Sequence, residues 1–169
     1  MLTRRDIFSQ LALATMAATL ASQRAFAQNI PYGLRPSIGE TLDANCSLTQ
    51  ALKALANGSG EFRKFVSQAR EDISDALSLI ADLTGSGEPL ELGETIVQEA
   101  NRLLASEGSF DTVGGYARRV QATLLECDRI LSAIDDNLDI SDEDVRDLFG
   151  YFNGLNLLGA AIVGFGRTV

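Results

Sequence analysis

Two segments of the chain place apolar residues at alternating steps of four and three positions, and this rhythm constrains the fold most strongly. Such steps follow the turn of an α-helix and leave one apolar stripe along each segment. The stripes are Phe62, Val66, Ala69, Ile73, Ala76, Ile80 and Leu83, and then Val113, Ala117, Val120, Leu124, Cys127, Leu131 and Ile134. Helices pack along stripes of this kind. Because no stretch shows the two-residue alternation of strands, the sequence predicts an all-α, single-domain bundle of four or five helices.

The region before the first stripe predicts a tether and a short helix. Residues 28–40 contain two prolines and two glycines, a composition that predicts an extended tether. Ser47 and Gln50 have the spacing of a capping box, which together with a later glycine predicts a helix near 41–57. The folded domain is therefore expected to span 41–169.

Between the two stripes, a further helix is predicted over 93–106. Its apolar face consists of Ile96, Val97, Ala100, Leu103 and Leu104. Gly114 and Gly115 open the helix of the second stripe, and no phosphate-binding pattern follows them. We interpret this pair as a flexible start to that helix.

The segment 148–166 carries 19 consecutive uncharged residues and includes small residues at helix-packing spacing. The small residues that could let another helix approach are Gly150, Gly154, Gly159, Ala160 and Gly164. Three interpretations are compatible with this pattern. The segment is the central helix of the bundle, which is the favoured interpretation, or an interface with another subunit, or a membrane anchor. Asn153 and Asn156 oppose exposure to lipid.

The N-terminal segment 1–27 has the organisation of a signal peptide. A positive region with Arg4 and Arg5 precedes an uncharged stretch over 7–21, and Ala25-Phe26-Ala27 forms a cleavage site that leaves Gln28 as the new N-terminus. The apolar stretch is shorter than the roughly 20 residues that span a bilayer.

The residues Thr3 to Phe8 resemble the twin-arginine (Tat) signal of bacterial export. That signal has Ser or Thr, two arginines and any residue, followed by Phe and Leu and often by Lys. Here Ile7 and Phe8 supply the two apolar residues, although Phe is one position late and Lys is missing. The alternative is an ordinary Sec signal. Either signal predicts export to the periplasm, and the resemblance implies contact with the Tat machinery and export in the folded state.

The net charge of the mature chain limits the classes of partner that it can bind. The segment 1–27 holds three of the 14 Lys and Arg and one of the 23 Asp and Glu, so the segment 28–169 has a net charge of −11. Nucleic acid and anionic lipid headgroups both require a positive surface, so neither is expected to bind. Contact with a membrane would have to come through the uncharged C-terminal segment.

The absence of histidine removes the commonest general base and metal ligand. A Ser-His or Cys-His nucleophile is excluded, and we predict no catalytic, metal-binding or cofactor-binding residues. Glu71 and Asp75 stand four positions apart, a spacing more typical of a solvated helix face than of a catalytic pair. An enzyme that uses carboxylates is a disfavoured alternative.

The two cysteines, Cys46 and Cys127, are too far apart in sequence for a CxxC redox or zinc motif. In an oxidising periplasm they could form a disulfide. Two buried free thiols are the alternative, and a protein that folds in the cytoplasm before Tat export cannot depend on the bond.

The most acidic stretch, 135–149, has a local resemblance to a calcium loop because Asp135, Asn137 and Asp139 alternate. That template requires Gly at its sixth position and Glu at its twelfth, where this chain has Ile and Arg. Ser141 and Asp144 instead predict the N-terminal cap of a helix, with acidic residues in its first turn.

These observations favour an exported, non-catalytic helical protein that serves as an accessory subunit or interaction module of a larger complex. In signal, size and helicity alone, the chain resembles the small subunits of exported flavin-dependent alcohol or sugar dehydrogenases. That resemblance implies a larger protein partner that is exported with the chain. The alternative is a bundle that binds a small apolar ligand between its helices.

Overall fold

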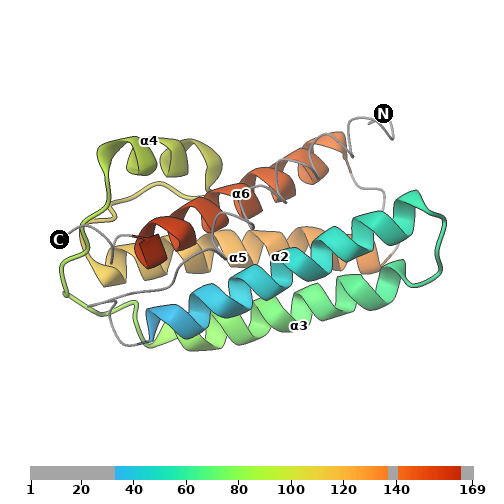
Figure 1. Cartoon of the computed structure of the whole chain (residues 1–169), viewed down its shortest axis with the longest axis horizontal. Helices are drawn as coiled ribbons and strands as arrows, with labels where there is room; N and C mark the ends of the chain where they lie inside the picture. The colour runs from blue at the N-terminus through green and yellow to red at the C-terminus, as the bar shows by residue number, and fades with distance from the viewer. Residues whose placement is uncertain (1–32, 137–140, 165–169) are drawn as a thin grey trace.

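The computed structural model describes residues 33–136 and 141–164, which fold as an all-α bundle (Figure 1). Its helices are α2 (Leu34–Ala56), α3 (Phe62–Ala81), α4 (Glu94–Leu103), α5 (Val113–Asp135) and α6 (Asp142–Gly164). The long helices α2, α3, α5 and α6 run alternately up and down along the bundle, and the short α4 lies beside α6 near one end (Figure 1). Within the described ranges the only β-type pairing is an isolated bridge between Pro89 and Thr112.

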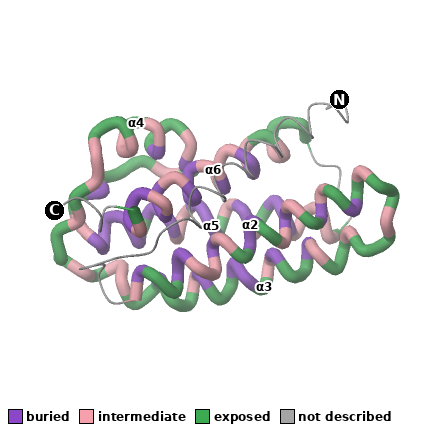
Figure 2. Tube along the Cα trace, viewed as in Figure 1, coloured by how far each residue is buried: buried purple, intermediate pink, exposed green. Residues whose placement is uncertain are grey.

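Both predicted stripes form the core of the bundle, which confirms this part of the sequence analysis. The stripe of α5 is buried from Val113 to Leu131, and that of α3 is buried from Val66 to Ile80. The outermost residues, Phe62, Leu83 and Ile134, are partly buried against the same core. Figure 2 shows buried residues along the inner sides of the long helices, whereas α4 is mostly exposed or intermediate. The observed α4 is shorter than the predicted helix over 93–106.

The predicted tether is wrong for residues 34–40, which form the first turns of α2. Two prolines and two glycines predicted extended chain, but the missing N–H of Pro36 costs little in the first turn of a helix, where backbone N–H groups have no helical partner. The helix starts after Gly33, whose φ of 99° favours glycine. Ser47 is therefore not an N-cap. It lies inside α2, and its Oγ donates a hydrogen bond of 2.8 Å to Asp72 Oδ2 of α3.

The start of α6 agrees with the predicted cap. The backbone N–H of Asp144 donates to Ser141 Oγ at 3.0 Å, and that hydroxyl donates to Asp144 Oδ2 at 2.8 Å. Asp142, Glu143 and Asp144 occupy the first turn, where the helix dipole favours negative charge. Asn137 and Asp139, two of the positions compared with a calcium loop, lie outside the described residues.

Gly114 and Gly115 do not make a flexible start to α5, so this interpretation is wrong. Both are buried, and the chain around Ser86 packs directly against the first turn of the helix. The N–H groups of Val113 and Gly114 donate to the carbonyls of Glu88 and Ser86 at 2.9 and 3.0 Å. A Cβ at Gly114 would lie 2.5 Å from Ser86 O, and one at Gly115 would lie 2.7 Å from a backbone oxygen in the preceding loop. Glycine is needed here because backbone approaches backbone.

Replacing Gly114 by alanine tests this close approach. We expect Gly114→Ala to lower the free energy of unfolding by about 2 kcal/mol or more, because the new methyl group overlaps backbone atoms that cannot move aside. Urea denaturation followed by circular dichroism measures the change.

Gly39→Ala is the matched control, since Gly39 lies inside α2 and a Cβ there meets nothing within 4 Å. There alanine should stabilise the protein by up to about 1 kcal/mol through its higher helix propensity. Equal stability of Gly114→Ala and the parent chain would contradict the proposed close packing.

Candidate functional site

The residues predicted to direct export all lie outside the described residues. They are the signal residues Arg4, Arg5, Ile7 and Phe8 and the cleavage-site residues Ala25, Ala27 and Gln28. The export signal therefore stays a prediction.

The predicted interface residues of α6 do not share one surface. A Cβ at Gly154 would lie 2.8 Å from Leu104 Cδ2, and one at Gly159 would lie 3.0 Å from Ile38 Cγ2. These two glycines therefore let the end of α4 and α2 pack closely on α6 within this chain. Ala160 is half-buried, Gly164 is exposed, and a Cβ at Gly150 would meet only one backbone oxygen, at 3.9 Å.

The described part of the uncharged segment, residues 148–164, packs against α2, α4 and α5. The residues of α6 from Leu148 to Ile162 that are buried are Leu148, Phe149, Phe152, Gly154, Leu155, Asn156, Leu158, Gly159, Ala161 and Ile162. Across the described ranges, α6 included, no helix combines the length and the apolar character that crossing a membrane requires.

Asn156 is the polar exception in this buried helix. It is 2 % exposed, and neither Oδ1 nor Nδ2 of its side chain has a hydrogen-bond partner among the described residues. A buried polar group without a partner costs about 1–3 kcal/mol. Asn156 therefore marks a place on α6 where a donor and an acceptor are still needed.

A buried arginine that the sequence analysis missed holds the loop between α4 and α5. Arg119 of α5 is 3 % exposed. Its Nε donates to Ser106 O at 3.1 Å and its NH1 to Gly108 O at 3.0 Å, and NH1 also bonds Asn101 Oδ1. The guanidinium lies 4.1 Å from the ring centroid of Phe110, a cation–π geometry.

The acceptors around Arg119 are neutral, so this side chain stabilises the loop without forming an ion pair in its hydrogen-bonded shell. Burial lowers the pKa of Arg119, and the nearby charge of Glu107 acts in the opposite direction. Gly108, with φ of 149°, brings its backbone close to the side chain, and a Cβ there would lie 3.3 Å from Arg119 Cδ. No local sequence pattern predicts this arrangement, because its acceptors are mainly backbone carbonyls. We interpret Arg119 as structural.

Removing Arg119 should therefore destabilise the protein. We expect Arg119→Ala to lower the free energy of unfolding by about 3 kcal/mol, because it leaves buried carbonyls without donors. Arg119→Lys should recover only part of this loss, since an ammonium lacks the planar fork of donors. Chemical denaturation provides the measurement.

Arg102→Ala is the control, because Arg102 is exposed and pairs with Glu99 one turn away. This variant should change stability by less than about 0.5 kcal/mol. If Arg119→Ala were as mild as Arg102→Ala, the structural role of Arg119 would be wrong.

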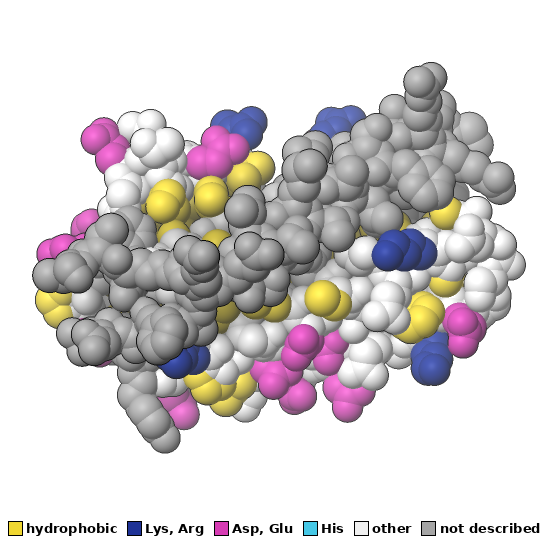
Figure 3. Space-filling view, in the orientation of Figure 1, with side chains coloured by type: hydrophobic (Ala, Val, Ile, Leu, Met, Phe, Trp, Pro, Cys, Tyr) yellow, Lys and Arg dark blue, Asp and Glu magenta, His cyan; other side chains and the backbone are white. Residues whose placement is uncertain are grey.

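Acidic side chains gather on the outer surface of α2 and α3, visible along the lower edge of Figure 3. Partial burial raises the pKa of Glu40, and the charges of Asp75, Asp43 and Asp72 raise it further. Asp72 is nevertheless well bonded, since it accepts from Ser47 and from Gln68 Nε2 at 3.0 Å. Within the described ranges, no group of three or more His, Cys, Asp or Glu is arranged to hold a metal ion.

The carboxylate pair singled out in the sequence, Glu71 and Asp75, lies on the solvent side of α3. Both residues are exposed, and Glu71 accepts a hydrogen bond from Gln68 Nε2 of the same helix, at 3.5 Å. This environment is that of a solvated helix face, as the spacing indicated.

The possible disulfide between Cys46 and Cys127 is not present, and the two cysteines are free. Cys46 is exposed on α2 and Cys127 is buried on α5, so the alternative of two buried thiols is right for Cys127 alone. No Cα of α2 lies within 8 Å of a Cα of α5. Because a disulfide requires Cα atoms less than about 7 Å apart, this pair cannot close without moving the backbone. The cause is topological: α3 and α6, rather than α5, are the long helices that contact α2.

Thiol labelling distinguishes the two cysteines. In the native protein we expect a maleimide to modify Cys46 alone, with Cys127 reacting only after unfolding. Partial burial raises the pKa of Cys46, and Asp43 and Asp72 raise it further, so its labelling should be slow at neutral pH and accelerate as pH rises. Mass spectrometry of labelled peptides measures both rates. A mass increase of about 2 Da on reduction of the unlabelled protein would reveal a disulfide and contradict the structure.

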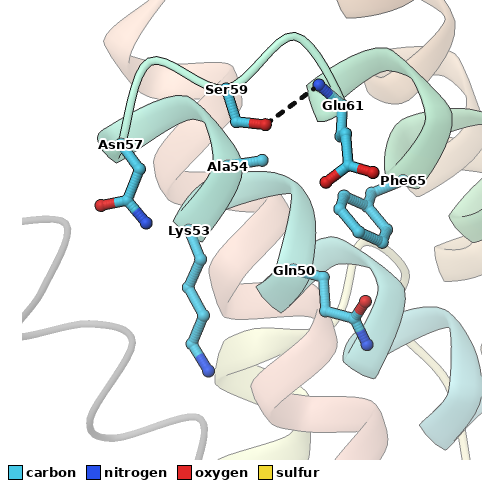
Figure 4. A pocket seen from close by; sticks show the side chains of 7 residues that line it. All are labelled: Gln50, Lys53, Ala54, Asn57, Ser59, Glu61 and Phe65. Carbon is cyan, nitrogen blue, oxygen red and sulfur yellow. Dashed lines mark hydrogen bonds between the residues drawn. The ribbon is translucent and has the colours of Figure 1, made fainter.

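A depression of about 270 Å³ lies beside the turn between α2 and α3 (Figure 4). Its lining residues are Gln50, Lys53, Ala54, Asn57, Ser59, Glu61 and Phe65. Ser59 Oγ accepts a hydrogen bond from the N–H of Glu61 at 3.2 Å, and Lys53 extends away from the turn (Figure 4). This depression is at the end of the helical hairpin and not between the core helices, where an apolar ligand was considered.

Comparisons of the chain with protein-family models, with curated proteins and with solved structures find no match.

Proposed function

We propose that this chain is an exported, periplasmic, non-catalytic helical protein that serves as an accessory subunit or interaction module of a larger exported complex. The observation that carries the proposal is the N-terminal pattern, in which Arg4 and Arg5 precede an uncharged stretch and Ala25-Phe26-Ala27 supplies a cleavage site. A twin-arginine signal implies that the protein crosses the membrane already folded.

The free cysteines support folding before export. Cys46 and Cys127 are free, and no Cα of α2 lies within 8 Å of a Cα of α5, so the bundle needs no disulfide and no oxidising compartment to form. Its core consists of apolar stripes on long helices, and contacts of this kind can form in the reducing cytoplasm. The fold is thus compatible with export after folding.

The partner in this proposal is a larger protein chain. In signal, size and helicity the chain resembles small subunits whose signal exports a catalytic subunit with them. The surface also suits a protein partner better than nucleic acid, because the mature chain is strongly acidic.

Copurification tests the proposal. A C-terminally tagged chain, purified gently from the periplasm, should bring down one larger protein in stoichiometric amount. The double substitution Arg4→Lys and Arg5→Lys should leave both proteins in the cytoplasm, because the Tat signal requires the arginine pair. Fractionation and mass spectrometry provide the measurement.

As a matched control, Arg63→Lys and Arg118→Lys make the same chemical change outside the signal and should leave export intact. Normal export of the signal variant would show that the Sec interpretation is right. A tagged protein that is exported as a monomer without any partner would contradict the subunit proposal.

A further inference from the structure

The depression beside the turn between α2 and α3 stands on an ordered backbone. Gly58, with φ of 66°, follows the end of α2, and the N–H groups of Gly58 and Ser59 donate to the carbonyls of Leu55 and Ala54 at 3.1 and 2.8 Å. This pair of bonds is the Schellman motif, which satisfies the last carbonyls of a helix and fixes the direction in which the chain leaves it. A ligand in the depression would therefore not have to order the backbone around it.

The floor of the depression is apolar. Ala54 of α2 is 7 % exposed and lies in the middle of the lining residues, and the half-buried Phe65 of α3 lies to one side of it (Figure 4). The volume of about 270 Å³ is just below the roughly 300 Å³ at which pockets for drug-sized ligands begin. The depression therefore has room for a small molecule only.

Two opposite charges lie at opposite ends of this floor. Glu61 lies at the turn, next to Phe65, whereas the side chain of Lys53 extends away from the turn (Figure 4). Both residues are exposed, and neither forms an ion pair with another residue of the described part of the chain. The ammonium and the carboxylate can therefore pair with a ligand that carries the opposite charges at its two ends.

The rest of the rim consists of neutral groups that donate and accept hydrogen bonds. Gln50 and Asn57 each carry a carboxamide, and the hydroxyl of Ser59 accepts from the N–H of Glu61 and keeps its own hydrogen to donate. That bond is the only one marked among the seven residues of Figure 4, so the lining side chains do not bond one another. A peptide group carries one donor and one acceptor, which these carboxamides can match.

We propose that this depression binds a short peptide of about two residues whose amino and carboxyl termini are both free. The carboxylate of the peptide pairs with Lys53, its ammonium pairs with Glu61, and its central peptide group bonds the carboxamides of Gln50 and Asn57. An apolar side chain of the peptide rests on the floor. An extended dipeptide is about 7 Å long, so its two charges can meet partners at separate ends of the depression.

This inference goes beyond the proposed function and does not depend on it, because the contacts involve neither the export signal nor a larger protein. The affinity should be low, with a dissociation constant on the order of 1 mM, since ion pairs at exposed positions contribute little.

Titration of the nitrogen-labelled full-length chain with L-alanyl-L-leucine tests the proposal. In nitrogen–proton correlation spectra we expect saturable shifts of the side-chain amide signals of Gln50 and Asn57. The same dipeptide with an acetylated N-terminus and an amidated C-terminus keeps both side chains but carries neither charge. It should bind at least about tenfold more weakly, because both charge-assisted contacts are lost.

Single substitutions separate the two ends of the peptide. In Glu61→Gln, acetylation of the peptide should no longer weaken binding, and in Lys53→Gln, amidation of its C-terminus should no longer do so. Each variant should bind the free dipeptide about threefold or more weakly than the parent chain. As a matched control, Glu99→Gln with Arg102→Gln removes an exposed pair of opposite charges on α4 and should leave the affinity unchanged.

Equal affinity for the free and the doubly capped dipeptide would overturn the proposal. Shifts that do not saturate, or that spare Gln50 and Asn57, would overturn it as well. An affinity that falls equally in the α4 control variant would show a general effect of charge on the chain and would also contradict a site at the depression.

Discussion

The packing of two apolar stripes, one on α3 and one on α5, is the constraint on which the rest of the bundle depends. Both stripes combine large residues such as Ile73 and Leu124 with small ones such as Ala69 and Ala117, and all four of these side chains are fully buried. A mixture of large and small side chains lets two helices approach closely while the core stays filled. With α3 and α5 in contact, α2 packs on α3 and α6 packs on α5, and α2 and α6 touch each other.

The smaller α4 region is attached by a different kind of interaction. Helix α4 is short and only its Ala100 is buried, so its own apolar burial is limited. Hydrogen bonds to backbone carbonyls also hold this region in place. Arg119 donates to carbonyls of the loop that follows α4, and the first turn of α5 donates to carbonyls of the loop that precedes α4. The glycines at the start of α5 serve the same attachment, because only they leave room for the loop backbone.

Features that follow from local periodicity can be predicted from the sequence, whereas contacts between segments that are distant in sequence cannot. The stripes of α3 and α5 and the cap at Ser141 are local patterns, and the structure confirms them. The role of Gly114 depends on the loop around Ser86, which is distant in sequence. The role of Arg119 depends on backbone carbonyls, which every sequence carries and which therefore leave no sequence pattern. The start of α2 was misplaced because Pro36 is equally compatible with a tether and with a first helical turn. For the candidate interface, the small residues indicate close helix packing but not which helix approaches, so Gly154 and Gly159 face different neighbours. The export signal stays a prediction from the segment 1–28.

The ion pair between α5 and α6 and the hydrogen bonds of Arg119 respond differently to acid. Arg129 joins α5 to α6 through Asp144, whose pKa is lowered by its bond to Ser141 and by Arg129. A carboxyl group with a lowered pKa stabilises the folded state above its ordinary pKa and loses that contribution as pH falls through its folded pKa. The contacts of Arg119 have no such dependence, because guanidinium stays charged and carbonyl and amide oxygens do not titrate in this range. Acidification therefore weakens the exposed ion pair between Arg129 and Asp144, whereas Arg119 keeps its hydrogen bonds to the loop after α4.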